Sequence, residues 1–180
     1  DARTLLFSAE KDRRRITDVI WDASRRLLAD PEVAGSTARW YRRTPDEMQR
    51  LRDGAYVGPP LPDAAPVSLM SYTDLMHTAN LFGLIAVRDR YDRPQTIRAG
   101  RLWQRAHLLA TARGLAARPA NGAVEMIDHE RRIGAAPETA ERLAPWTGDR
   151  AFQPTFMFYM GFPTRPAPAS PRRAIREVLA

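Results

Sequence analysis

Hydrophobic residues recur at two different periods along this chain, and these periods predict where helices and strands lie. Apolar side chains at helical spacing predict one helix over 10–29 and a longer one over 95–113. Two segments, 81–87 and 152–162, are apolar at consecutive positions, which is typical of strands covered on both faces. A shorter strand is expected over 4–8. Long helices combined with a few buried strands indicate an α+β fold, in which helices flank a mixed central sheet.

Local signals mark where several of these helices end. The Asp-Pro pair at 30–31 should stop the first helix, because proline disfavours helical geometry in the residue before it. The Thr-Pro-Asp-Glu stretch at 44–47 matches a capping box with proline at the first helical position. A short helix should follow to about Arg52, with Gly54 as its left-handed terminator, and Gly114 should end the long helix.

Stretches rich in proline and glycine divide the rest of the chain. The segment 57–66 contains four prolines, so we expect a surface loop, which could serve as a lid. The segment 116–122 is also expected to be a loop. No internal repeat is present, and residues 1–180 are expected to form a single domain. Further short helices are predicted over 68–80, 127–135, 137–143 and 172–179.

Composition narrows the class of protein. With 44% hydrophobic and 27% charged residues, the chain is expected to fold rather than remain disordered. It contains no cysteine, which excludes a disulfide scaffold, a thiolate metal cluster and a cysteine nucleophile, and favours a cytoplasmic location. The longest apolar run, 81–87, is far shorter than the ~20 residues that a membrane helix needs.

The charge of the chain is strongly positive but evenly spread. The formal net charge is +7, and Lys11 is the only lysine among 28 basic residues. The arginines are not clustered and no nucleic-acid-binding motif is present, so nucleic acid is not the expected partner. Arginine holds phosphate through a forked pair of hydrogen bonds, and a phosphorylated cofactor therefore suits this chain.

Motifs of several common chemistries are missing from the sequence. His77, His107 and His129 lie too far apart in the chain to share a helical turn, so we expect no metal site. The sequence has no nucleophile-elbow motif, no Rossmann glycine motif and no P-loop. Hydrolase, dinucleotide-loop and P-loop chemistry therefore have no support from motifs.

Two features could hold a ligand. The long helix ends in a glycine-containing segment, 114–122, whose small residues would let backbone amides approach a flat ligand. Near the end of the chain, Arg172 and Arg173 stand where a loop meets a predicted helix, and paired arginines suit a phosphate group. Taken alone, the first feature is better explained as an ordinary helix end, and the second as a solvated basic tail.

Taken together and in this order, the segments resemble the nitroreductase-like family of FMN-dependent oxidoreductases. The matching motifs are the Gly-Leu-x-x-x-Pro-x-x-Gly segment at 114–122, the strand over 152–161, and the Gly-x-Pro and Ser-Pro-Arg-Arg stretches between 161 and 173. Earlier segments similar to the Acg-type branch of this family are 29–32, 40–43 and 53–54.

The resemblance implies an FMN protein that passes reducing equivalents from NAD(P)H to electron-poor acceptors such as nitroaromatics or quinones. It implies that Asn121, through the amide near it, faces N5 of the flavin. On this basis Gly122→Val is expected to exclude FMN while leaving the fold largely intact. The residues implied to contact the flavin ring are Pro119, Ala120, Asn121 and Gly122, and those implied to bind its phosphate are Arg172 and Arg173.

The family binds FMN at a dimer interface, or between two fused halves in the Acg-type branch. This sequence lacks the Arg-x-Ser/Thr segment with which the family usually begins, so we expect the second half of a longer protein. A protein that binds or sequesters FMN without turnover, with 57–66 as a lid, remains the alternative. No side chain is assigned as catalytic, although Tyr72, Phe82 and Trp103 are aromatic residues that could line an acceptor pocket. Of these, Trp103 is expected to lie in the core instead.

Overall fold

A computed structural model describes residues 2–52, 55–56, 78–163 and 174–179. The expected loop over 57–66, nearly all of the expected helix over 68–80 and the loop before Arg172 lie outside the described residues. The described elements, in chain order, are β1 (Ala2–Phe7), α1 (Glu10–Leu28), α2 (Pro31–Ala38), β2 (Tyr41–Arg42), α3 (Pro45–Leu51), β3 (Ala55–Tyr56), β4 (Leu81–Val87), α5 (Arg93–Ala112), β5 (Ala116–Pro119), α6 (Gly122–Arg132), α7 (Glu138–Leu143), η1 (Ala144–Trp146), β6 (Gln153–Gly161) and η2 (Ile175–Glu177).

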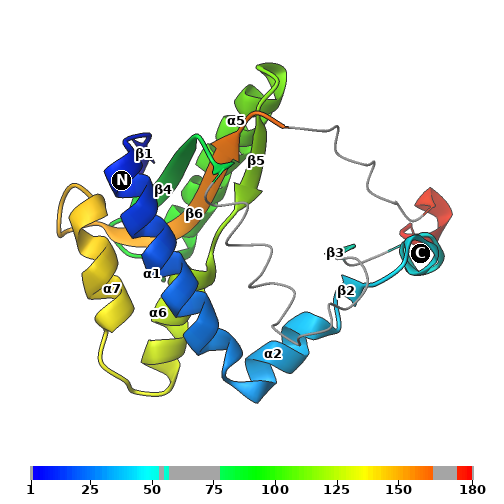
Figure 1. The fold of residues 1–180 in the computed structure, drawn as a ribbon, viewed down its shortest axis with the longest axis horizontal. Helices are drawn as coiled ribbons and strands as arrows, with labels where there is room; N and C mark the ends of the chain where they lie inside the picture. Colours follow the sequence, from blue (N-terminus) through cyan, green and yellow to red (C-terminus); the bar gives the residue numbers. More distant parts are fainter. Residues whose placement is uncertain (1, 53–54, 57–77, 164–173, 180) are drawn as a thin grey trace.

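The central sheet has four strands in the order β1-β4-β6-β5, and each neighbouring pair is antiparallel (Figure 1). A separate two-stranded sheet pairs β2 with β3 in parallel. The two strands expected to be interior and adjacent, β4 and β6, are the central pair. The α+β class with helices flanking a sheet is therefore confirmed, but the central sheet of the described residues is antiparallel and not mixed as expected.

Helices cover both faces of the sheet, which explains why β4 and β6 have no polar face. One face packs against α1, α6 and α7, and includes Phe82 and Met157. The other face packs against α5, and includes Ile85 and Phe158. A Cβ on Gly83 would lie 2.0 Å from the Phe158 ring, so the glycine lets that ring lie flat against the neighbouring strand.

Two helix boundaries follow the sequence signals, and one detail differs. The first helix ends at Leu28, and α2 begins at once at Pro31, where the Asp30 carboxylate accepts from the Glu32 amide at 2.8 Å. The capping box before α3 is confirmed. The left-handed residue that ends α3 is Arg52, with a φ of 53°, rather than Gly54, which lies outside the described residues.

The stretch expected to be a loop over 116–122 is largely regular structure. Residues Ala116–Pro119 form β5, because their backbone pairs with β6, although they are poor strand formers. The following helix, α6, begins at Gly122, earlier than the expected start at 127. Leu109, expected in the apolar stripe of the long helix, is exposed. In the expected tail helix, the described residues 174–179 contain only a three-residue 3-10 turn.

A short arm leads away from the sheet. The chain leaves α1 through α2 to a region that contains β2, β3 and α3, where η2 also lies (Figure 1). Arg52 and Glu177 join α3 and η2 at 3.8 Å. None of the described helices has the length and apolar character needed to span a bilayer. Large apolar side chains exposed on this arm are Trp40, Leu51, Ile175, Val178 and Leu179.

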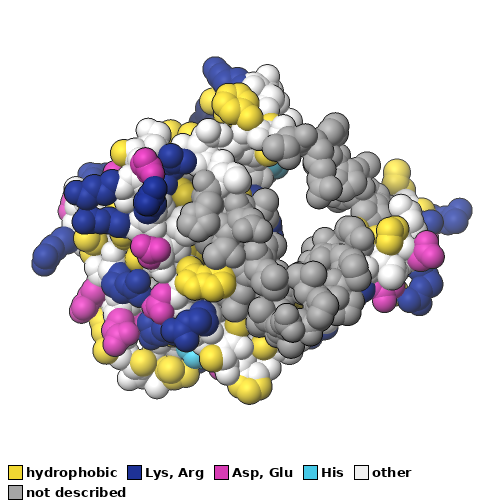
Figure 2. Space-filling model, viewed as in Figure 1, with side chains coloured by type: hydrophobic (Ala, Val, Ile, Leu, Met, Phe, Trp, Pro, Cys, Tyr) yellow, Lys and Arg dark blue, Asp and Glu magenta, His cyan; other side chains and the backbone are white. Residues whose placement is uncertain are grey.

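Arginine and acidic side chains are interspersed over the outer surface of α1 and α7 (Figure 2). Asp22 of α1 accepts from Arg142 of α7 at 2.5 Å and from Arg25 at 3.4 Å. Arg14 likewise pairs with Glu10, one turn earlier on α1. Many basic charges on this face are therefore balanced locally, despite the net charge of the chain.

Candidate functional site

The corner that joins β5 to α6 is anchored to the middle of β6. The amide of Ala120 donates to the Met157 carbonyl at 2.8 Å, and the Met157 amide donates to Oδ1 of Asn121 at 2.9 Å. Ala120 itself is fully buried. The segment Pro119–Gly122, on which the sequence analysis placed a flat ligand, therefore has a fixed position in the fold.

The N-terminus of α6 lies at this corner with its amides unused. In the part of the chain that the structure describes, no acceptor is found for the amides of Asn121, Gly122, Ala123 and Val124. Asn121 does not cap the helix, because its side chain is bound to β6. The corner thus presents hydrogen-bond donors at the positive end of a helix dipole.

Gly122 packs directly against Ser24 of α1. A Cβ on Gly122 would lie 2.1 Å from the Ser24 Oγ, so the glycine allows the two helices to approach closely. Ser24 is buried, and its hydroxyl has no hydrogen-bond partner among the described residues. An added side chain would point into this contact and require the Ser24 hydroxyl to turn away, so the structure argues against the expectation that Gly122→Val leaves the fold largely intact.

Tyr159 supplies a second buried hydroxyl close to the corner. It lies opposite Arg118 in the β5–β6 ladder, next to the register pair of Pro119 and Phe158. Its ring belongs to the apolar core on the α1 face, and its hydroxyl has no well-aligned hydrogen-bond partner within the described residues, although the Arg118 side chain interacts with it. Burial raises the pKa of Tyr159, and the nearby Arg118 guanidinium offsets part of that rise.

These groups have the chemistry that a flavin requires. Buried hydroxyls without partners are costly unless something hydrogen-bonds to them. The Tyr159 hydroxyl lies near the corner, whereas the Ser24 hydroxyl lies inside the contact between α1 and α6. The ring of a flavin has carbonyl oxygens and nitrogens at its edge and apolar faces. Neutral donors for the ring edge, together with Arg118 at the sheet edge, therefore fit FMN.

The two parts of the expected site are not brought together by the described residues. Pro119, Ala120, Asn121 and Gly122 form the corner, whereas Arg172 and Arg173 lie outside the described residues. The segment that follows them, η2, packs beside α3 on the arm, away from the corner (Figure 1).

The aromatic residues expected to line an acceptor pocket have other positions. Phe82 is completely buried in the core, so it cannot line an open pocket. Trp103 packs against Phe156 and Phe158 at ring-centre distances of 4.8 and 5.0 Å, and so belongs to the core between α5 and the sheet. Tyr72 lies outside the described residues.

The histidines that the structure describes also lie apart. His107 stacks on Trp103 of α5, with ring centres 5.2 Å apart. His129 of α6 lies 3.8 Å from the Asp30 carboxylate. His77 is outside the described residues, and within the described ones no group of three His, Asp or Glu side chains gathers around a point.

Sequence reasoning missed Ser24, Tyr159 and Arg118. Ser24 carried a usable signal, because it stands on the apolar stripe of α1 between Ile20 and Leu27, where a hydroxyl has to be buried. Tyr159 and Arg118 carried no such signal in the sequence, because they come close together only when β5 forms a strand in this register with β6.

Comparison with known proteins identifies the fold. The chain is similar to a nitroreductase with bound FMN from Desulfitobacterium hafniense DCB-2, at 12% identity and a TM-score of 0.59, over 99% of this chain and 74% of that one. It is similar to a nitroreductase-like family protein from Bacillus cereus at 11% identity and a TM-score of 0.50, over 99% and 72%. No protein-family model and no curated protein sequence matches it. The chain therefore has the nitroreductase-like fold.

Proposed function

We propose that this protein is an FMN-dependent oxidoreductase, which moves reducing equivalents from NAD(P)H to electron-poor acceptors such as nitroaromatics or quinones. The observation that carries the proposal is the β5–α6 corner, where unused amides and buried hydroxyls without described partners gather in a nitroreductase-like fold. A solved structure of similar fold contains FMN, which supports the choice of ligand.

The residues of the corner would bind and orient the flavin ring. The amides of Asn121 and Gly122 are proposed to donate to the ring edge, with Asn121 nearest N5, while Pro119 and Ala120 lie beneath the ring. The bound flavin supplies the redox chemistry, by accepting a hydride and passing electrons on. The protein contributes fixed donors: because the Asn121 side chain is held by β6, the neighbouring amide needs no reorganisation to receive the ring.

Arg172 and Arg173 are proposed to bind the phosphate of FMN. A phosphate group that leaves water needs several donors, and two guanidinium groups provide them in forked geometry. The two arginines follow the strand β6, which pairs with β5, after only eight residues beyond Pro163.

A partner subunit, or a fused N-terminal half of a longer protein, is proposed to complete the site. The arm that holds α3 and η2 exposes large apolar side chains, among them Trp40, Ile175 and Leu179. Exposed apolar clusters of this kind mark surfaces that are covered by another chain or domain. We propose that residues 1–180 form one domain of this assembly, in the cytoplasm, with 57–66 as a loop or lid.

The decisive experiment is the absorbance spectrum of the purified full-length protein, followed by NADPH and NADH oxidation with a quinone. Bound yellow flavin with turnover supports the oxidoreductase, and bound flavin without turnover supports the alternative, a protein that binds or sequesters FMN. If the full-length protein binds no flavin, even after incubation with FMN, the proposal is wrong. Omission of the quinone is the control for oxidation by oxygen alone.

A further inference from the structure

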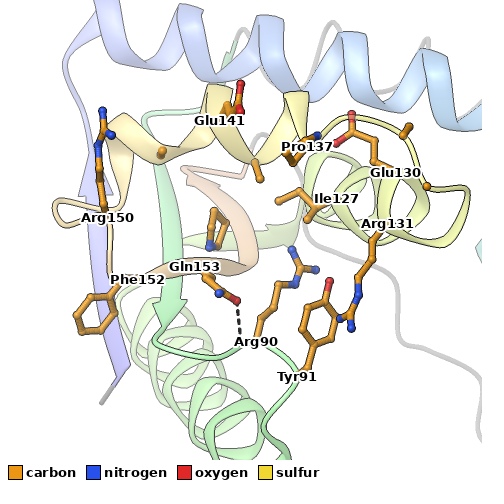
Figure 3. Close-up of a pocket in the computed structure, with 15 residues that line it drawn as sticks. Arg90, Tyr91, Ile127, Glu130, Arg131, Pro137, Glu141, Arg150, Phe152 and Gln153 are labelled. Atoms are coloured by element: carbon orange, nitrogen blue, oxygen red, sulfur yellow. Dashed lines mark hydrogen bonds between the residues drawn. The ribbon is translucent and has the colours of Figure 1, made fainter.

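A cavity lies away from the β5–α6 corner. It has a volume of about 890 Å³ and opens between the α6–α7 connection, the β4–α5 turn and the start of β6 (Figure 3). This volume is typical of pockets for small organic ligands. Apolar side chains that line it are Ile127, Pro137, Ala140, Ala144 and Phe152.

Arg90, from the β4–α5 turn, is the one nearly buried cation among the residues that line this cavity. Its side chain is only 6% exposed, and its guanidinium points toward Ile127 (Figure 3). One terminal nitrogen, Nη2, donates to the Val124 carbonyl at 3.0 Å and to the Asp128 carboxylate at 2.8 Å. The other, Nη1, is buried with no partner among the described residues. Leaving a buried charged donor without a hydrogen bond costs free energy, so an acceptor placed at this atom would stabilise the protein.

Cationic groups outweigh available anionic groups around this nitrogen. Arg131 lies over the Tyr91 ring, with its Cζ 3.9 Å from the ring centre, and Arg150 lines the far side. Of the acidic residues that line the cavity, Glu130 is already bound by the Thr139 amide and hydroxyl and by Arg26. Glu141 is exposed on α7. Asp128, on the neighbouring surface, is used by Arg90 and by the Tyr91 hydroxyl, which donates to it at 2.9 Å.

We propose that this cavity is a binding site for a small organic carboxylate with a compact apolar body, separate from the flavin site and beyond the function proposed above. Nη1 of Arg90 is covered in this structure, so the Arg90 side chain has to turn toward the cavity for Nη1 to donate to the carboxylate, while the body lies against Ile127 and Ala140. A single unused buried donor suits a carboxylate monoanion better than a phosphate dianion, which requires several donors. An inorganic ion would leave the apolar wall of the cavity without contacts, so the ligand is expected to carry an apolar group as well.

The test uses the full-length protein and phenylpropionate as the probe, with binding measured by calorimetry. Phenylpropanol has the same body without the charge, acetate has the charge without the body, and inorganic phosphate tests for simple anion binding. We expect phenylpropionate to bind at least about tenfold more tightly than each of the three, as a charged hydrogen bond implies.

Two variants locate the site. Arg90→Gln removes the donor, and Ala140→Phe fills the cavity without altering charge; each should weaken phenylpropionate about tenfold or more. Arg14→Gln, an exposed arginine on α1, is the matched control and should leave binding unchanged. Circular dichroism and thermal unfolding establish whether each variant is folded. If Arg90→Gln does not fold, the binding measured for Ala140→Phe tests the proposal.

Three results would overturn the proposal. The first is that phenylpropionate does not bind at millimolar concentration. The second is that phenylpropanol or phosphate binds as tightly as phenylpropionate does. The third is that folded Ala140→Phe binds it as the unaltered protein does, in which case phenylpropionate does not occupy this cavity.

Discussion

Gly122 and Ser24 meet where α6 begins and α1 passes it: a Cβ on Gly122 would lie 2.1 Å from the Ser24 Oγ. Both residues are buried, so neither can move aside into solvent. This contact joins the proposed flavin corner to the main core, and it makes the corner sensitive to a single methyl group.

Gly122→Ala is therefore expected to destabilise the protein by about 1–3 kcal/mol, since overpacking forces neighbouring groups to shift. Gly122→Val should cost more. Urea unfolding measures the change in the free energy of unfolding. Gly100→Ala in α5 is the control, because no atom lies within 4 Å of its added Cβ, and it should raise stability by about 0.5–1 kcal/mol. Equal stability of Gly122→Ala and the unaltered protein would contradict the close contact.

The core between the sheet and α5 should depend on Phe158 more than on Phe156. Phe158 is completely buried, whereas Phe156 is half-buried. Phe158→Ala is expected to cost about 3–5 kcal/mol of unfolding free energy, and Phe156→Ala less. Phe162→Ala, at an exposed position after β6, should change stability little. A loss for Phe158→Ala as small as that of Phe162→Ala would disprove its place in the core.

Removal of the Tyr159 hydroxyl should affect FMN binding and protein stability differently. Because the buried hydroxyl has no well-aligned hydrogen-bond partner among the described residues, although Arg118 interacts with it, Tyr159→Phe should change the stability of the flavin-free protein by less than about 1 kcal/mol. If the hydroxyl serves the flavin, as we propose, the same change should weaken FMN binding by about tenfold. Tyr91→Phe, on the β4–α5 turn, is the control for binding. Unaltered FMN affinity in Tyr159→Phe would remove this hydroxyl from the site.

Titration of Tyr159 gives an independent check on its burial. Burial raises its pKa in the folded protein, so the folded state holds the proton more tightly than the unfolded state does. The stability from this effect is present below the unfolded pKa of ~10 and is lost as the pH rises through the folded value. An ultraviolet titration of the tyrosines should show one late component that Tyr159→Phe removes. Loss of the same component in Tyr91→Phe instead would contradict the assignment.

The paired arginines Arg172 and Arg173 should discriminate FMN from riboflavin, which differ by one phosphate. Replacing the contacting arginine with alanine should weaken FMN by about 10- to 150-fold, the equivalent of one or two charged hydrogen bonds. The affinity for riboflavin should be almost unaffected. Replacement by lysine should recover only part of the lost FMN affinity, because an ammonium group cannot donate a bidentate pair of hydrogen bonds. The measurement is fluorescence titration of both flavins. If neither variant separates the two ligands, the arginines do not bind the phosphate.

The Asp22 carboxylate should make stability depend on acidity. Its burial alone would raise the pKa, but Arg142 and Arg25 outweigh burial and hold the pKa of Asp22 below its ordinary value. The resulting stability is present above the unfolded pKa of ~3.9 and is lost as the pH falls through the folded value. For this partly exposed pair we expect at most about 1 kcal/mol.

Arg142→Gln tests this pair. It should flatten the acid limb of stability and shift the Asp22 resonance in a nuclear magnetic resonance titration toward ordinary behaviour. Arg101→Gln makes the same charge change on α5 and should do neither. An acid limb that is identical in Arg142→Gln and the unaltered protein would show that the pair contributes nothing.

The sequence alone determined the elements whose signals are local or repeated. Helical spacing predicted α1 and α5 to within a few residues, and unbroken apolar runs predicted β4 and β6 as strands covered on both faces. The capping box before α3 was also correct. Each of these signals arises within one segment, from its own periodicity or its own hydrogen bonds.

The tertiary structure alone decided the rest. Residues 116–119 form a strand because β6 offers them a ladder, and Gly122 is fixed by Ser24, nearly a hundred residues earlier in the chain. The unpartnered atoms of Ser24, Tyr159 and Arg90 likewise exist only because distant elements exclude water from them. Such groups carry no mark in the sequence, since burial is a property of the packed elements and not of any one segment.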